Sequence, residues 1–283
     1  MFKSKIIIGT WSLSGSFGSI EKKEIYNIIE FAIESGFLEF DLAPNYGFGK
    51  IEEIFADIKK QKPNIILNTK CGNNYNNTKS FNQKDIIDSL NRSLDLLKSI
   101  NILYLHNPRD EVQNISELIS LVLDFKRQGL IKKTGISFAR NHYFDKKYVN
   151  QLDFVQDEIN ILYCNNLSYL KNYDCKIIAR SPLASGVLSG KLHRNITFEK
   201  EDYRFSWLKG KRLENILFQI DEIKKIIDCD IRKYAKYFVL SNPNINKVIF
   251  GIKSIDHIKE LLCDIEIFEN SNSIKTKEIM KLA

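Results

Sequence analysis

The chain has 283 residues, of which 43% are hydrophobic and 27% charged, a composition typical of a folded globular protein with a sizeable core. It contains no run of about 18 apolar residues, so we expect no membrane-spanning helix. Its first residues resemble a strand and not a secretion signal, so we expect a cytoplasmic protein. The formal net charge is +7. The basic residues that give it either spread over a solvated surface or gather in a pocket for phosphates.

The arrangement of cysteines, histidines and basic residues argues against a cysteine-pair framework, a metal site and a nucleic-acid-binding surface. The five cysteines are scattered without a CxxC pair, which fits a reducing compartment. The four histidines show no metal-ligand spacing, so no metal is expected. Basic residues form no concentrated stripe, so we expect no nucleic-acid partner.

Eight short apolar runs alternate with amphipathic segments along the chain. The expected strands are 6–10, 38–42, 65–70, 101–106, 132–137, 153–158, 176–180 and 246–251. The expected helices are 22–35, 83–98, 115–128, 214–228, 231–240 and 255–262. Strict alternation predicts parallel strands joined by right-handed crossovers.

Eight such repeats favour an α/β fold of the (β/α)₈ TIM-barrel type, with residues 1–283 forming a single domain. An open doubly wound sheet is the alternative, but the glycines at 9, 15 and 18 do not have the GxGxxG spacing of that fold. Residues 184–213 form one long irregular stretch, and a loop of this length in a compact domain is usually functional or mobile.

Four polar side chains fall near the carboxyl ends of consecutive predicted strands, the face where such barrels place their active sites. They are Asp41, Tyr46, Lys70 and His106. A lysine ammonium lowers the pKa of a nearby tyrosine, a carboxylate keeps the lysine charged, and a histidine can stabilise a developing alkoxide. Each residue alone has a structural explanation, as a turn cap, rim aromatic, structural cation or loop histidine. Together they predict carbonyl reduction with Tyr46 as proton donor and a cofactor as hydride source.

A series of motifs in this chain resembles the aldo-keto reductase family, in the same order and over nearly the whole length. The motifs are GTW (9–11), DLAPNYG (41–47), NTK (68–70), LYLHNP (103–108), GIS (135–137), VQDEIN (155–160), SPLASGVLSGK (181–191) and FVLSNPNINKVIFGIKS (238–254). The resemblance implies a TIM barrel, a catalytic tetrad made of the four residues above, and hydride transfer between a nicotinamide dinucleotide and an aldehyde or ketone.

The resemblance also implies where the dinucleotide binds. Ser137 and Gln156 would hold the nicotinamide carboxamide, and the phosphates would lie along 181–190 and 251–254, where a helix N-terminus favours anions. Lys253 and Ser254 fall where the family binds the 2′-phosphate, which favours NADPH over NADH, although Ser254 could simply cap the helix. The expected cofactor-binding residues are Gly9, Thr10, Trp11, Ser137, Gln156, Arg180, Ser181, Pro182, Leu183, Gly186, Gly190, Lys191, Gly251, Lys253, Ser254, His257 and Glu260.

Several positions depart from the family pattern. Phe138 replaces the usual asparagine, Arg180 replaces the aromatic that stacks on the nicotinamide, and Leu261 and His257 replace usual adenine-side residues. The family's N-terminal hairpin has no counterpart before the first strand, and the short C-terminal tail predicts an open substrate pocket.

The Arg–Ser pair at 180–181 looks like a branch of the family found in bacterial surface-polysaccharide and unusual-sugar pathways. This predicts a keto-sugar or nucleotide-linked sugar as substrate, with Arg180 on a phosphate of substrate or cofactor. The alternative is that Arg180 only replaces the stacking aromatic. Trp11, Phe48, Phe138 and Trp207 are candidates to line the pocket, with Trp11 the best placed.

The expected function is therefore an NADPH-dependent reductase of a small-molecule carbonyl compound, acting as a monomer or small homo-oligomer. The altered cofactor contacts leave a second function open, a non-catalytic dinucleotide-binding or redox-sensing protein on the same barrel. The intact set of four catalytic residue types argues against it. A lyase or isomerase on this barrel is a third alternative, which the fold does not exclude.

Overall fold

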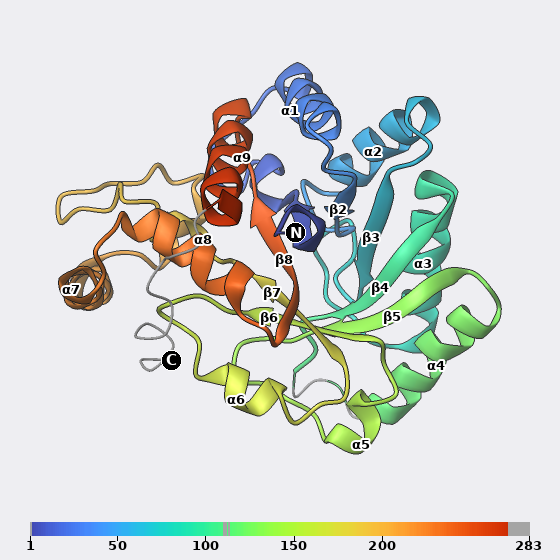
Figure 1. Cartoon of the computed structure of the whole chain (residues 1–283). Coiled ribbons are helices and arrows are strands. Elements are labelled where there is room, and N and C mark those ends of the chain that lie inside the picture. The colour runs from blue at the N-terminus through green and yellow to red at the C-terminus, as the bar shows by residue number, and fades with distance from the viewer. Residues whose placement is uncertain (1, 110–111, 113, 271–283) are drawn as a thin grey trace.

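The computed structural model describes residues 2–109, 112 and 114–270, and in it the strands close into one parallel barrel in chain order (Figure 1). The strands are β1 (Ile6–Gly9), β2 (Glu39–Asp41), β3 (Ile66–Cys71), β4 (Ile100–His106), β5 (Ile131–Ser137), β6 (Phe154–Glu158), β7 (Lys176–Arg180) and β8 (Ile245–Gly251). Strand β8 completes the ring by pairing with β1. The predicted TIM barrel is confirmed, and the alternative of an open sheet is excluded.

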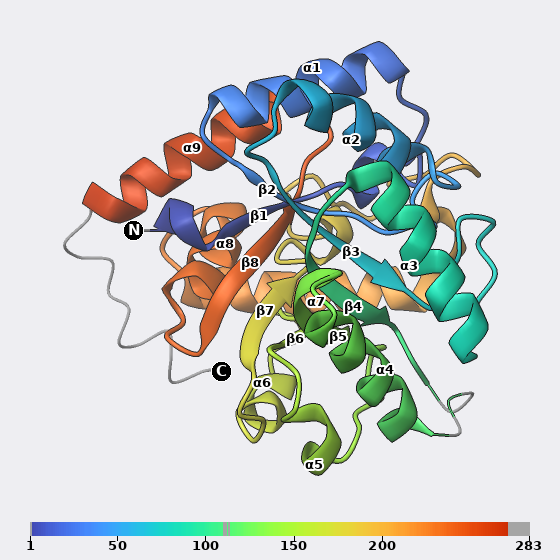
Figure 2. The ribbon, with the colours of Figure 1, turned by 90° about the vertical axis from the view of Figure 1, so that its right-hand side faces the viewer.

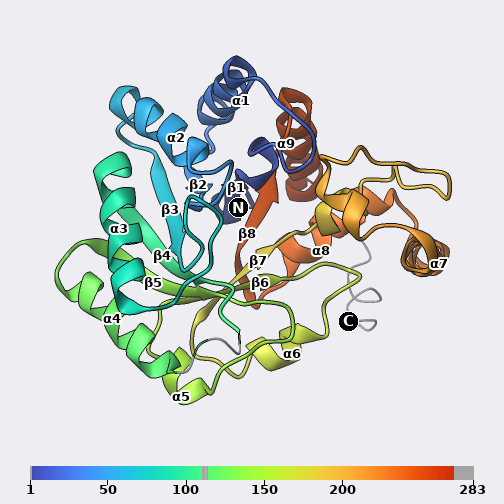
Figure 3. The same cartoon turned by 180° about the vertical axis from the view of Figure 1, so that it is seen from behind.

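Helices surround this barrel (Figures 1 and 3). They are α1 (Lys22–Glu34), α2 (Lys50–Gln61), α3 (Gln83–Leu97), α4 (Ile115–Arg127), α5 (Lys146–Val149), α6 (Asn166–Leu170), α7 (Gly210–Ile226), α8 (Ile231–Ser241) and α9 (Ile255–Asn270). Figure 2 shows α3 and α4 in front of the strands, whereas α7 lies outside the ring beyond α8 in Figures 1 and 3.

Apolar residues at helical spacing explain why most of these segments are helices. In α3, Ile86, Leu90 and Leu97 are buried, and the side chain of Asn82 caps the helix by accepting a hydrogen bond from the backbone of Asp85 at 2.8 Å. The expected end of the last helix at residue 262 is wrong, because buried Ile265 and later residues continue its apolar stripe to residue 270.

Polar side chains fill the amino-terminal end of the barrel interior. The amide of Asn68 donates to the Glu39 carboxylate at 2.9 Å, and Lys247 pairs with the same carboxylate. Above this layer lie buried apolar residues, including Ile7, Tyr104 and others from the strands. The interior is therefore packed, which leaves the carboxyl end of the barrel as the place for a site.

The stretch 184–213 is less irregular than expected. It contains the short 3-10 helices η3 (Ala184–Gly186) and η4 (Tyr203–Ser206), and α7 begins at residue 210, not 214. The backbone N–H of Tyr203 donates to the carbonyl of Ser16 at 2.7 Å, and the Tyr203 ring lies 5.0 Å from that of Trp11. These contacts fasten the stretch to the loop after β1, next to the carboxyl end of the barrel.

Candidate active site

A cavity of about 1010 Å³ opens at the carboxyl ends of the strands, and each of the eight strands contributes to its wall. This volume lies at the upper end of the range of about 300–1000 Å³ for sites that hold small molecules and cofactors. The four residues of the expected tetrad form one part of its wall (the catalytic end), and residues around the start of α9 form another. The cavity therefore joins the expected catalytic and cofactor regions.

Lys70 is at the centre of the catalytic end. Its ammonium lies 2.6 Å from a carboxylate oxygen of Asp41, 2.6 Å from the carbonyl of Leu42 and 3.3 Å from the hydroxyl of Tyr46. The side chains of Lys70 and Asp41 are only 1% and 5% exposed. The end of β3 thus places a buried cation between the end of β2 and the tyrosine that follows it.

His106, from the end of β4, completes the group. Its ring lies edge-on to that of Tyr46, with centroids 6.3 Å apart. Burial, together with the charges of Lys70 and Arg180, holds the pKa of His106 well below its usual value, so the imidazole is neutral. Its buried Nδ1 has no hydrogen-bond partner among the described residues. The structure therefore brings all four residues together around one end of the cavity.

The pKa of Tyr46 differs from the expectation. Burial raises it above the usual value, and the nearby Lys70 offsets only part of that effect, while Asp41 raises it further. The expected lowering of this pKa was wrong, because the ammonium was taken into account and the loss of solvent was not. The phenol is therefore protonated at neutral pH, which suits a proton donor.

Ser137 and Gln156 belong to the same hydrogen-bonded network. The Ser137 hydroxyl lies 2.8 Å from the amide oxygen of Gln156, and the Gln156 amide donates to Asp41 at 3.2 Å. Thr10, expected to contact the cofactor, is instead buried, and its hydroxyl donates to the backbone carbonyl of Asp41 at 2.8 Å. Asp41 is thus fixed by Lys70, Gln156 and Thr10 together.

Most residues expected to contact the cofactor line the cavity. These are Gly9, Trp11, Ser137, Gln156, Arg180, Ser181, Pro182, Leu183, Gly186, Lys191, Gly251, Lys253, His257 and Glu260. Thr10, Gly190 and Ser254 lie outside its wall. The Ser254 hydroxyl accepts a hydrogen bond from the backbone of His257 at 3.3 Å, which is the capping role considered for it.

Basic side chains mark the end of the cavity near α9. Lys191, Arg232 and Lys253 all line it, and Arg232 pairs with Glu260 at 2.8 Å. The buried Nε of Arg232 has no hydrogen-bond partner within the described part of the chain, and it lies 3.8 Å from a carboxylate oxygen of Asp230. Cations beside a helix N-terminus are suited to phosphates. The residues present therefore fit the phosphates of a nicotinamide dinucleotide.

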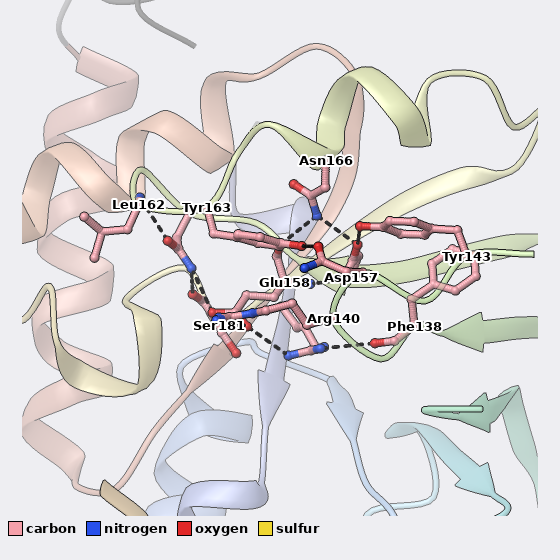
Figure 4. Close-up of polar contacts among 12 residues, drawn as sticks. Phe138, Arg140, Tyr143, Asp157, Glu158, Leu162, Tyr163, Asn166 and Ser181 are labelled. Carbon is pink, nitrogen blue, oxygen red and sulfur yellow. Dashed lines mark hydrogen bonds and ion pairs between the residues drawn. The ribbon is translucent and has the colours of Figure 1, made fainter. Parts of the chain in front are cut away.

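Arg180 does not project freely into the cavity. One guanidinium nitrogen donates to the carbonyl of Phe138 at 3.2 Å, and another lies 3.8 Å from a Glu158 carboxylate oxygen. Arg140 lies 2.7 Å from the same Glu158 oxygen (Figure 4). Neither Arg140 nor Glu158 was among the site residues expected from the sequence. Because side chains alternate along a strand, the position of Glu158 two residues after Gln156 was the available signal.

The aromatic candidates divide into two groups. Trp11 and Trp207 line the cavity. Phe48 is 69% exposed and does not line it, whereas Phe138 is fully buried and packs its ring against Tyr143. Asn45, Asn73 and Asn107 were also missed, and these residues line the cavity together with the tetrad.

The remaining expectations concern metals, membranes and thiols. Among the residues that the structure describes, no group of three or more histidine, cysteine or acidic side chains is placed to hold a metal ion. Within the same residues, no helix combines the length and apolarity needed to cross a bilayer. All five cysteines are free thiols. The C-terminal tail, expected to leave the pocket open, falls at 271–283, outside the described residues.

Comparison with known proteins agrees with this geometry. The model of the "Aldo/keto reductase family" matches residues 5–275. The aldo-keto reductase YhdN of Bacillus subtilis is 26% identical and covers 91% of this chain and 84% of its own. The NADH-specific methylglyoxal reductase of Escherichia coli is 23% identical, with 93% and 90% covered. A glycerol dehydrogenase structure from Gluconobacter oxydans superposes with a TM-score of 0.77 at 23% identity, covering 98% and 90%. The chain belongs to the aldo/keto reductase family of NAD(P)-dependent oxidoreductases that act on carbonyl groups.

Proposed function

We propose that this protein uses NADPH to reduce the carbonyl group of a hydroxylated, negatively charged substrate, such as a keto-sugar that carries a phosphate or is linked to a nucleotide. The observation that supports it most strongly is the convergence of Asp41, Tyr46, Lys70 and His106 at one end of a cavity whose other end is basic. The catalytic roles of these four residues and the cofactor contacts are part of the proposal.

The chemistry follows from the protonation states of these side chains. A bound reduced dinucleotide supplies hydride to the carbonyl carbon. Tyr46 donates its phenolic proton to the carbonyl oxygen, and neutral His106 donates a hydrogen bond to the same oxygen as negative charge develops on it. Lys70, held by Asp41, stabilises the phenolate that remains until solvent returns the proton. The product is the corresponding alcohol.

The proposed preference for NADPH depends on Lys253. One relative is named for its NADH specificity, so membership of the family does not by itself decide the cofactor. Lys253 lines the cavity at the start of α9, and its ammonium donates to the carbonyl of Phe17. An ammonium in this place can pair with a 2′-phosphate and has no such partner on NADH.

Replacement of Lys253 by methionine is expected to raise the Kd for NADPH by about tenfold, the loss of one hydrogen bond to a charged group, and to leave the Kd for NADH within about twofold. Quenching of Trp11 and Trp207 fluorescence measures both constants, since both rings line the cavity. Lys62→Met, at an exposed lysine outside the cavity, is the control. Equal weakening of both nucleotides would refute the assignment.

The proposed substrate class depends on the polar side chains near the tetrad. Asn45, Asn73 and Asn107 line the cavity. The amide nitrogens of Asn45 and Asn73 donate to protein groups, whereas the side-chain oxygens of Asn45 and Asn107 have no hydrogen-bond partner among the described residues and can accept from sugar hydroxyls. Arg140 is 45% exposed, lines the cavity, and shares the single Glu158 carboxylate with Arg180, which leaves it able to bind an anion. Because Arg140 is the more exposed of the two arginine side chains, at 45% against 24%, and Arg180 also donates to the carbonyl of Phe138, we assign the anion to Arg140.

Replacement of Arg140 by glutamine is expected to raise the KM for a phosphorylated keto-sugar by about tenfold while kcat stays within about twofold, the pattern of lost uniform binding. The KM for a neutral keto-sugar should not change. Steady-state kinetics with a phosphorylated sugar, a sugar carboxylate and a neutral sugar separates phosphate from carboxylate recognition. A KM that changes equally for all three substrates would contradict anion binding by Arg140.

A further inference from the structure

Arg180 is held firmly in the wall of the cavity that contains the tetrad. It is the last residue of β7 and pairs in register with Glu158 of β6. The hydrogen bond to the carbonyl of Phe138 and the contact with Glu158 fix its guanidinium, and its side chain is 24% exposed. Its Nε is buried and has no hydrogen-bond partner in the described ranges. This cation is therefore a fixed part of the cavity wall.

The charge of Arg180 acts at the catalytic end of the cavity. It lowers the pKa of both Tyr46 and His106, which places the guanidinium within electrostatic reach of both groups. Among the described residues, the charged groups that shift His106 are all cations, namely Lys70, Arg180 and Lys79. Arg180 is thus one of three cations that act on His106.

Among the described residues, no carboxylate is paired with Arg180 alone. The Glu158 carboxylate is shared with Arg140, which lies closer to it, at 2.7 Å against 3.8 Å. Asp157, the other neighbouring acid, is buried and accepts hydrogen bonds from Tyr143 and Asn166 (Figure 4); burial raises its pKa, and the charge of Arg180 lowers it. Arg180 therefore has no close carboxylate of its own, and its guanidinium remains a charged group of the cavity wall.

The position of a hydride donor follows from that of the proton donor. Reacting atoms must approach to about 3–3.5 Å, so a ring that reduces a carbonyl held by Tyr46 and His106 lies beside these residues. The same space is reached by the charge of Arg180. The oxidised nicotinamide ring carries a positive charge, and the reduced ring is neutral. A fixed cation therefore repels the oxidised ring and has little effect on the reduced ring.

We propose that Arg180 sets the preference of the site for the oxidation state of the cofactor, because its fixed positive charge makes the site bind the reduced dinucleotide more tightly than the oxidised one. This inference rests on the proposed function. It gives the arginine a role that the usual aromatic residue at this position does not have. Weaker binding of the oxidised dinucleotide speeds its release after each turnover and so favours reduction as the working direction.

The test is the ratio of two binding constants, Kd for NADP⁺ divided by Kd for NADPH, measured by tryptophan quenching without any substrate. In Arg180→Gln the ratio is expected to fall about tenfold, the effect of removing one nearby charge in a partly solvated site. Arg180→Lys, which keeps the charge, should retain the ratio within about threefold. Arg127→Gln, at an exposed arginine outside the cavity, should leave it unchanged. If Arg180→Gln does not fold, Arg180→Met removes the charge and keeps the aliphatic stem.

The outcomes separate this inference from the proposed function. An unchanged ratio in Arg180→Gln, with both nucleotides still bound, overturns the inference and leaves the proposed function intact. An equal fall in the lysine and glutamine variants also overturns it, because the effect would then come from shape and not charge. If the unaltered protein binds neither nucleotide, the proposed function itself fails.

Discussion

Replacement of Tyr46 by phenylalanine is expected to lower kcat for carbonyl reduction by a factor on the order of 10² or more, the usual loss when a general acid is removed. The variant keeps the ring and its packing, and it removes the hydroxyl that lies 3.3 Å from the Lys70 ammonium. The Kd for NADPH should stay within about twofold, because the hydroxyl acts on the carbonyl and not on the dinucleotide.

The pH profile gives a second measurement on the same group. Burial raises the pKa of Tyr46, so the phenol of the unaltered protein stays protonated until the pH exceeds the ordinary tyrosine value of about 10. The rate of reduction should therefore be flat across neutral pH and fall only in strong alkali. The lowered pKa of His106 predicts no step near pH 6.5 from that residue. Turnover in Tyr46→Phe equal to that of the unaltered protein would show that another group donates the proton.

Replacement of Lys70 by methionine is expected to reduce the free energy of unfolding by about 3–5 kcal/mol, because it leaves a buried carboxylate without its cation. Lys70 and Asp41 are 1% and 5% exposed, with 2.6 Å between ammonium and carboxylate, so little solvent reaches the carboxylate to replace the lost partner. Denaturant unfolding at pH 7 measures the change. Activity should also be lost, since the same ammonium lies beside Tyr46.

The double variant Lys70→Met with Asp41→Asn provides the control for this effect. Removing the stranded charge should restore much of the lost stability while activity stays low. Lys60→Met, which breaks an exposed pair with Asp57 on α2, should leave unfolding unchanged. If the double variant is no more stable than Lys70→Met, the loss comes from packing and not from an unpaired carboxylate.

The strands were predictable because barrel strands are buried on both faces and appear in the sequence as short apolar runs separated by helical patterns. The helix α2 was missed although Ile51, Ile54, Phe55 and Ile58 are buried at helical spacing, a signal that was present. The helices α5 and α6 have four and five residues, too few to show a helical period. The path of 184–213 depends on contacts with distant residues such as Ser16, which no local pattern contains.

The site was predictable where it follows from topology. Parallel strands share one carboxyl end, so Asp41, Lys70 and His106 had to meet there if the barrel formed. The sign of the Tyr46 pKa was not predictable, because it depends on how much solvent the fold removes and not on which residues are neighbours in sequence. The ion pairs of Arg140 and Arg180 with Glu158 were not predictable either. They depend on the register of β5, β6 and β7 and on the path of the loop after β5 that carries Arg140.

A crystal structure with NADPH and an unreactive carbonyl analogue would locate the nicotinamide ring directly. We expect the ring between Tyr46 and Arg180, with its hydride-bearing carbon about 3–3.5 Å from the carbonyl carbon and the carbonyl oxygen on Tyr46 and His106. A ring bound anywhere that keeps the carbonyl out of reach of Tyr46 would contradict the proposed reduction.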